Sequence, residues 1–151
     1  AQKKTPPAKT SATQYGVPTP LSAIPNKLPD GSTVPPKAAN EKAYSFPGSF
    51  TPNNNAMRVI DRSQLDGIAA QLIASSGPIR IVGHTDSSGK QEANLRLGWL
   101  RAHSVKKLLA HMGIEEQRIR VQSAGSSQPR TTNDTEQGRA NNRRVVILLT
   151  Q

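Results

Sequence analysis

Apolar positions recur with the periodicity of helices and strands from about residue 45 to the end of the chain. Five of them have the spacing of an amphipathic helix: Leu65, Ile68, Ala69, Leu72 and Ile73. Ser63 and Asp66 resemble a capping box, so this helix is predicted to begin near Ser63 and to end at Gly77-Pro78. A second helix is predicted from Gln91 to Met112, with Gly113 as its stop. Its buried stripe comprises Leu95, Ala102, Val105, Leu108, Leu109 and Met112.

Strand patterns lie between and after these helices. Residues 79–82 form a short apolar run, 118–123 alternate, and 145–150 are apolar enough for a central strand. An irregular strand is expected around residues 44–50. The pattern predicts an α/β fold of the α+β sandwich type, in which two main helices pack on one face of a mixed sheet of about four strands.

The N-terminal third of the chain has a different composition. Ten of the twelve prolines fall between Pro6 and Pro52, among Lys, Ser, Thr and Ala, without a sustained apolar period. We therefore expect a flexible linker over residues 1–45 and a folded domain over 46–151. The alternative is an extraneous tail on the domain.

Charge and cysteine content narrow the possible functions. The formal net charge of +10 favours polyanionic partners, among them nucleic acid, anionic lipid and acidic wall polymers. The few aromatic residues, two Phe, two Tyr and one Trp, make a nucleic-acid reader less favoured. The absence of cysteine excludes disulfide scaffolds, cysteine-type zinc sites and thiol catalysis.

The stretch IRIVGHTDSSGK, residues 79–90, passes from a strand directly into a polar loop. A phosphate-binding P-loop would need glycine where His84 stands and Ser or Thr where Gln91 stands. Asp86 would also repel phosphate. The loop is therefore expected to present its carboxylate to a positively charged group.

Spaced motifs in two parts of the chain resemble those of one family. The first set is Gly83-His84-Thr85-Asp86, Gly89, Asn94, Leu95, Leu97, Arg101-Ala102 and Val105. The second set is Gly125, Pro129, Asn133, Thr135, Gly138-Arg139-Ala140 and Asn142-Arg143-Arg144-Val145. Over roughly residues 50–150 the chain resembles the OmpA-like peptidoglycan-binding domain of outer-membrane porin-type proteins, Pal lipoproteins and MotB-type stators.

The resemblance implies that the loop holds the diaminopimelate residue of the peptidoglycan stem peptide. Asp86 would bind its ammonium group, and Arg101 would bind its carboxylate through two prongs, which a lysine cannot do. Other positions that match the family's pocket are Asn94, Arg143, Asn53 and Thr85.

Each residue also has a structural interpretation. Asp86 alone would more often cap a turn, Arg101 alone would be a solvated helix residue, and His84 is expected to hydrogen-bond locally rather than bind metal. One of Arg143 and Arg144 is expected to pair with an acid. Gly98 departs from the serine of many relatives, and it would either allow close packing or loosen the helix.

No catalytic set is found, so we expect a binding module without cofactor or metal rather than an enzyme. The resemblance implies a periplasmic location in a Gram-negative bacterium, with attachment to the outer membrane through an anchor upstream of Ala1. It also implies other envelope proteins as partners, as in a lipoprotein or secretion assembly. The alternative function is nucleic-acid binding through the linker and the arginine-rich surface.

Overall fold

The computed structural model describes residues 20–46, 50, 54 and 59–151, except for the side chains of 59–62. Its strands are β1 Glu41–Phe46, β2 Ile79–His84, β3 Ile119–Gly125 and β4 Val145–Thr150. Its α-helices are α2 Val59–Ile73, α3 Gln91–His111 and α4 Glu136–Asn142. Three short 3-10 turns complete the order: η1 Leu21–Ala23, η2 Gly31–Thr33 and η3 Glu116–Arg118.

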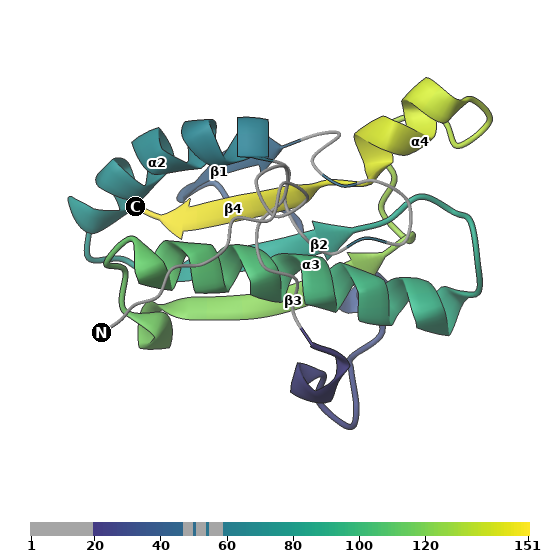
Figure 1. Ribbon diagram of the computed structural model, residues 1–151, viewed down its shortest axis with the longest axis horizontal. Helices are drawn as coiled ribbons and strands as arrows, with labels where there is room; N and C mark the ends of the chain where they lie inside the picture. The colour runs from purple at the N-terminus through teal and green to yellow at the C-terminus, as the bar shows by residue number, and fades with distance from the viewer. Residues whose placement is uncertain (1–19, 47–49, 51–53, 55–58) are drawn as a thin grey trace, which may run out of the picture.

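The four strands form one mixed sheet in the order β1-β4-β2-β3 (Figure 1). β2 and β3 run parallel, with Ile81 beside Val121, and β4 runs antiparallel to both β1 and β2. The prediction that residues 145–150 form a central strand is confirmed. Both faces of β4 are apolar because the helices cover one face and the segment that contains Val34 covers the other.

The main hydrophobic core lies between α2, α3 and one face of the sheet. Its buried members from the helices are Leu65, Ala69, Leu72, Ala102, Val105, Leu108 and Leu109. Those from the strands are Ile79, Ile81, Ile119, Val145, Ile147 and Leu149. The strand residues are odd-numbered, as expected for alternating side chains that share one face. The predicted packing of two helices on one face is therefore confirmed.

The helix boundaries test the sequence patterns separately. α3 begins at Gln91 and ends at His111, and Gly113 follows with a φ of 103°, as predicted for a glycine stop. The predicted start of α2 is wrong, because this helix begins at Val59 and Ser63 lies inside it. α2 also ends at Ile73, four residues before Gly77. A capping pattern in an amphipathic stretch does not exclude helix on its N-terminal side.

The opposite face of the sheet is partly covered by the segment before β1. Val34 packs there in a second buried cluster with Val82, Ala124 and Leu148. Arg80 holds this segment by donating to the carbonyl oxygens of Pro35 and Pro36, at 3.0 Å each. In Figure 1 the segment is drawn in purple and lies beside β3.

The structure differs here from the expected linker over residues 1–45. Residues 20–40 contact the domain, and the expected boundary at residue 45 falls inside β1. The sequence concealed this packing because Val34 is the one residue of the segment in the buried cluster. The other contacts include the backbone of Gly31 against Ala124 and hydrogen bonds to the carbonyls of Val34, Pro35 and Pro36. Residues 1–19 lie outside the described residues.

Candidate functional site

The candidate site lies where β2 and β3 end and β4 begins. The loop from β2 into α3 and the short helix α4 lie together at this end of the molecule, on the right in Figure 1. The Ser87 backbone N–H donates to Asn133 Oδ1 at 3.3 Å, which joins the loop after β2 to the loop before α4. The carboxyl ends of parallel strands thus gather loops that are distant in sequence.

Two glycines bring α3 against β2 beside the site. A Cβ on Gly83 would overlap the carbonyl oxygen of Gly98. A Cβ on Gly98 would lie 2.9 Å from the Gly83 oxygen and closer still to Ser123 Oγ. Of the two roles that the sequence left open for Gly98, the structure supports close packing. This contact sets the distance of α3, and hence of Arg101, from the loop that carries Asp86.

Asp86 is held between a backbone donor and an arginine. Its Oδ1 accepts a hydrogen bond from the Ser88 backbone N–H at 2.9 Å, and its Oδ2 lies 2.8 Å from Arg143 Nη1. Burial disfavours the charged form, but the hydrogen bonds from Arg143 and Ser88 outweigh it, so the pKa of Asp86 lies below its usual value. Asp86 therefore caps its turn, as the structural interpretation expected, and is also a fixed negative charge.

Arg143 connects three separate segments. Its Nη1 bonds Asp86, its Nη2 lies 2.7 Å from Glu136 Oε2, and its Nε donates to the Phe50 carbonyl oxygen at 3.0 Å. Burial disfavours its charge, but Glu136 and Asp86 outweigh this effect and raise the pKa of Arg143. The prediction that one of the two adjacent arginines pairs with an acid is confirmed. Within the described residues, these contacts use three of its five N–H donors.

Arg101 is fully buried, so its interpretation as a solvated helix residue is wrong. Its Nε donates to the Asn54 carbonyl oxygen at 2.9 Å and its Nη1 to the His84 carbonyl oxygen at 3.1 Å. Its guanidinium carbon lies 5.1 Å from the centroid of the Phe50 ring. Burial lowers the pKa of Arg101 to about 9, and the charge of Asp86 opposes this change, so the guanidinium stays protonated at neutral pH.

The other predicted site residues are placed unequally. Asn94 is buried in the first turn of α3, and its Oδ1 lies 3.5 Å from the position of a Cβ on Gly89. Thr85 is buried beside Asp86, and its Oγ1 has no hydrogen-bond partner in the described part of the chain. Asn53 lies outside the described residues. In the structure Asp86 is thus bonded directly to Arg143, and the charges of both residues act on Arg101. Asn94 lies against Gly89 in the loop that carries Asp86.

Sequence reasoning missed several residues that build the site. Glu136 pairs with Arg143, and the Phe50 and Asn54 carbonyl oxygens orient the two arginines. Asn142 is fully buried, and its Oδ1 accepts from the backbone N–H groups of Arg130 and Thr131, at 2.8 and 3.0 Å. The seven-residue spacing of Glu136 and Arg143, two helical turns, was the available signal for their pairing. Backbone carbonyl partners leave no such signal.

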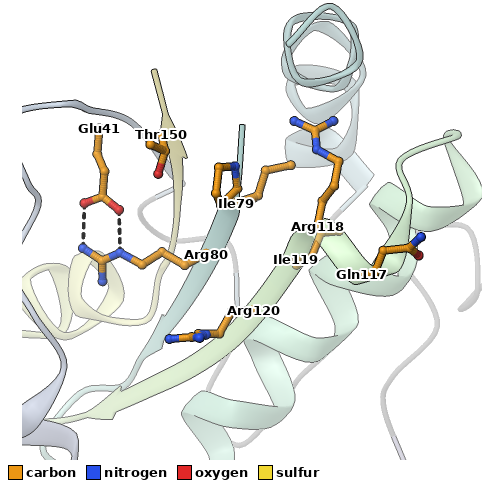
Figure 2. Close-up of a pocket in the computed structure, with 9 residues that line it drawn as sticks. Glu41, Ile79, Arg80, Gln117, Arg118, Ile119, Arg120 and Thr150 are labelled. Atoms are coloured by element: carbon orange, nitrogen blue, oxygen red, sulfur yellow. Dashed lines mark hydrogen bonds and ion pairs between the residues drawn. The ribbon is translucent and has the colours of Figure 1, made fainter. Parts of the chain in front are cut away.

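A separate hollow of about 540 Å³ lies at the other end of β2 and β3 (Figure 2). Its lining includes three arginines, Arg80, Arg118 and Arg120, with Glu41 as the acidic residue. Arg118 points away toward α2, where its Nη1 donates to the Leu72 carbonyl oxygen at 2.9 Å. Two hydrogen bonds join Arg80 to Glu41, at 2.7 and 2.8 Å. The polar groups of this hollow thus largely bind each other and the backbone.

Two further observations limit the chemistry. No group of three His, Asp or Glu side chains in the described part of the chain is placed to hold a metal ion. Among the helices described, none is long and apolar enough to cross a membrane.

Comparison with known proteins identifies the family. The model of the OmpA family matches residues 49–143, which include the Gly83–Asp86 motif and the arginine at position 143. The chain belongs to the OmpA family. Its mixed sheet with helices on one face is the fold expected from the sequence resemblance.

Particular relatives include lipoproteins and a wall anchor. The chain is 34% identical over 104 residues to the probable lipoprotein YiaD of Escherichia coli (strain K12), covering 67% of this chain and 47% of that protein. It is 38% identical over 100 residues to the peptidoglycan-associated lipoprotein of Buchnera aphidicola subsp. Baizongia pistaciae (strain Bp), covering 66% and 58%. The structure of the cell wall anchor of the T6SS from Pseudomonas aeruginosa aligns with a TM-score of 0.65 at 25% identity, covering 75% and 83%. The matches thus span about half of the length of these curated relatives.

Proposed function

We propose that the chain binds peptidoglycan non-covalently and anchors an envelope protein or assembly to the cell wall. The observation that carries this proposal is the buried cluster of Asp86, Arg101 and Arg143, in which one carboxylate and two guanidinium groups are fixed by backbone contacts. The homology to a peptidoglycan-associated lipoprotein and to a cell wall anchor supports it.

The ligand group that suits this cluster is the diaminopimelate of the stem peptide. Its free end offers an ammonium and a carboxylate on one carbon, so a receptor needs an anion and a cation at fixed separation. Asp86 would accept from the ammonium, and Arg101 would donate to the carboxylate, with Arg143 holding Asp86 in place. Charge-assisted hydrogen bonds of this kind are about twice as strong as neutral ones. Asn94 and Thr85 would line the same pocket, and Asn53 stays a predicted member.

The proposed role is that of a binding module and requires no cofactor, covalent step or nucleic acid. A fixed carboxylate that is already bonded to Arg143 is a poor general base, because its pKa lies below the usual value. The location that fits this role is the periplasm, with attachment to the outer membrane supplied by another part of the protein. Other envelope proteins would be its partners in the assembly.

A sedimentation assay with purified peptidoglycan tests the proposal. Asp86→Asn keeps the shape of the side chain but removes its charge, so binding should weaken about 100-fold, since a charged hydrogen bond is worth about 1.5–3 kcal/mol. Asp134→Asn is the matched control, because Asp134 is exposed in the nearby loop before α4. Equal binding by both variants and the parent would contradict the site.

The same assay separates pocket binding from general polyanion binding. A protein that neutralises many phosphates loses affinity steeply as salt rises, whereas one buried zwitterion pocket depends on salt weakly. We expect peptidoglycan binding to change less than about threefold between 50 and 200 mM salt. A steep decrease, with similar binding to single-stranded DNA, would favour the nucleic-acid alternative.

A further inference from the structure

A second cluster of basic groups lies on the face of the sheet opposite α2 and α3. Val82 and Val146 face this side, in the cluster that includes Val34. His84 and Arg144 come two residues farther along, where the register between β2 and β3 shifts. The His84 backbone N–H donates to the Arg144 carbonyl oxygen at 2.9 Å, and the charge of Arg144 acts on the His84 ring. Their side chains therefore lie side by side, on the other side of the sheet from the Asp86 cluster.

The polar atoms of this cluster are buried and incompletely paired. Arg144 is 8% exposed, and its Nη2 donates to the Gln128 carbonyl oxygen at 3.1 Å. Its Nε and Nη1, and the Nδ1 of His84, are buried and have no hydrogen-bond partner among the described residues. The local hydrogen bond predicted for the His84 side chain is therefore absent at Nδ1. Leaving such donors unpaired costs about 1–3 kcal/mol each, so a binding partner at this position would be stabilising.

The charges around Arg144 are unbalanced. Of the ion pairs found in the described residues, none includes Arg144, and Asp86 and Glu136 are both bound to Arg143. Burial, and then the positive charge of Arg130, lower the pKa of Arg144 to about 10. Burial and the charges of Arg144 and Arg130 lower the pKa of His84 to about 3. His84 is therefore neutral at pH 7, and one of its two ring nitrogens carries an N–H that can donate a hydrogen bond.

Arg130 supplies an approach to this cluster from solvent. It is exposed, and its Nη1 donates to Ser45 Oγ at 2.7 Å, at the edge strand β1. A single exposed hydrogen bond of this type contributes little to stability, so the guanidinium can turn toward a bound anion. Three basic side chains would then converge on one small negatively charged group.

We propose that Arg144, His84 and Arg130 form a binding site for one oxyanion group, a carboxylate or a phosphate. It lies on the sheet face opposite the cluster of Asp86, Arg101 and Arg143, which is called the peptidoglycan cluster below. Arg144 would supply its unpaired N–H groups, His84 a neutral donor and Arg130 a mobile second charge. The site shares no side chain with the cluster of Asp86, Arg101 and Arg143, although Arg101 donates to the His84 backbone carbonyl oxygen. It would give the domain a second contact with an acidic partner while the peptidoglycan cluster is occupied.

Titration of the whole chain with sodium phosphate and sodium acetate tests this site. Amide and arginine Nε–H signals are followed by NMR at pH 7, with NaCl used to hold the ionic strength constant. We expect saturable shifts, with a dissociation constant in the millimolar range, at residues 84, 130 and 144. Saturation by phosphate alone would assign a phosphate site, and saturation by acetate as well would assign a site that takes carboxylates. Saturation by neither ion overturns the proposal.

Variants establish which residues bind. Arg130→Gln should weaken the saturable response at least fivefold without altering the core, and Arg144→Gln should remove it. Arg120→Gln is the control, since Arg120 is exposed at the far end of the same strand pair. An equal loss in Arg120→Gln and Arg130→Gln would mean an adventitious ion only and would overturn the site. If Arg144→Gln does not fold, the parent chain and Arg130→Gln still decide the result. Asp86→Asn should leave the response unchanged, which separates this proposal from peptidoglycan binding.

Discussion

The two ends of the β2–β3 pair both combine arginines with a carboxylate, but they use them differently. At the hollow of Figure 2, Arg80 donates to both oxygens of Glu41, to Gln122 and to the carbonyl oxygens of Pro35 and Pro36. These contacts account for all five of its N–H donors. Arg80 is therefore a structural residue that ties the segment before β1 to the sheet.

At the candidate site two acidic residues, Asp86 and Glu136, share one arginine, Arg143. Arg143 uses three of its five donors on described residues, and buried Arg101 shares the field of the same carboxylate, Asp86. The comparison shows that an arginine-lined hollow is not by itself a binding site. What distinguishes the site is a fixed carboxylate, Asp86, bonded to a guanidinium, that of Arg143, which uses three of its five donors on described residues.

Among substitutions that distinguish the candidate site from the hollow of Figure 2, Arg101→Lys should have the largest effect on peptidoglycan affinity. Lysine keeps the charge but loses the planar fork and cannot donate to the Asn54 and His84 carbonyl oxygens in the same geometry. Peptidoglycan affinity should fall about tenfold or more, which corresponds to about 1.4 kcal/mol. Arg80→Lys is the control, and it should lower stability while peptidoglycan affinity changes less than twofold. The assignment of Arg101 fails if its variant retains the parent affinity.

A substitution in the contact between α3 and β2 should have an intermediate effect. In Gly98→Ala the new methyl group would clash with Ser123 Oγ and approach the Gly83 carbonyl oxygen, so α3 must move away from β2. The free energy of unfolding should fall by about 1–3 kcal/mol, as in other overpacked cores. Peptidoglycan affinity should fall as well, because Arg101 moves with the helix.

The control for this variant is Gly67→Ala in α2. Nothing lies within 4 Å of a Cβ at position 67, and alanine is the better helix former by about 0.8–1 kcal/mol. Denaturant unfolding should therefore show opposite signs for the two glycines. Stabilisation by both substitutions would mean that α3 does not lie against β2 as described.

The smallest expected effect is the pH dependence of stability that comes from the Arg80–Glu41 pair. The hydrogen bond from Arg80 outweighs the effect of burial and lowers the pKa of Glu41 from 4.5 to about 2. A carboxylate with a lowered folded pKa stabilises the fold above its unfolded pKa, and this contribution is lost as the pH falls through the folded value. The window is thus about pH 4.5 to 2.

In that window the Glu41→Gln variant should lose less stability than the parent. At pH 7 the variant should be less stable by about 1 kcal/mol, a value limited by solvent screening of the pair. Thermal unfolding at pH 7 and pH 3 measures the difference, and peptidoglycan affinity at pH 7 should not change. If the stability of the two proteins changed equally between pH 7 and pH 3, the Arg80–Glu41 pair would not contribute to the pH dependence of stability.

The sequence predicted the fold well where periodicity was long. Of the predicted α3 stripe, Ala102, Val105, Leu108 and Leu109 lie in the core, Met112 packs against it, and Leu95 is not part of it. The apolar run of β4 appears at the expected residues and contributes to the clusters on both faces of the sheet. Position 59 as the start of α2 and the packing of residues 20–40 were missed. Neither has a sustained apolar period, and Arg80 bonds to the backbone carbonyls of Pro35 and Pro36, 45 and 44 positions earlier.

For the candidate site, the sequence supplied residue types and positions but not the contacts between them. The family resemblance implied one pocket for Asp86 and Arg101, and in the structure both are buried and the charge of Asp86 acts on Arg101. The bond between Asp86 and Arg143 could not be predicted from spacing, because 57 residues separate them. The complete burial of Arg101 depends on tertiary packing beneath Phe50, which no helical pattern encodes.

The most direct test of the account is a comparison of two peptidoglycans that differ at the third residue of the stem peptide. One carries diaminopimelate, and the other carries lysine, which keeps the side-chain ammonium but lacks the adjoining carboxylate. If Asp86 and Arg101 bind the two charges together, the chain should prefer the first by about tenfold or more, since one charge-assisted hydrogen-bonded contact is lost. Equal affinity for both peptidoglycans would contradict the central claim, because it would show that the carboxylate is not recognised.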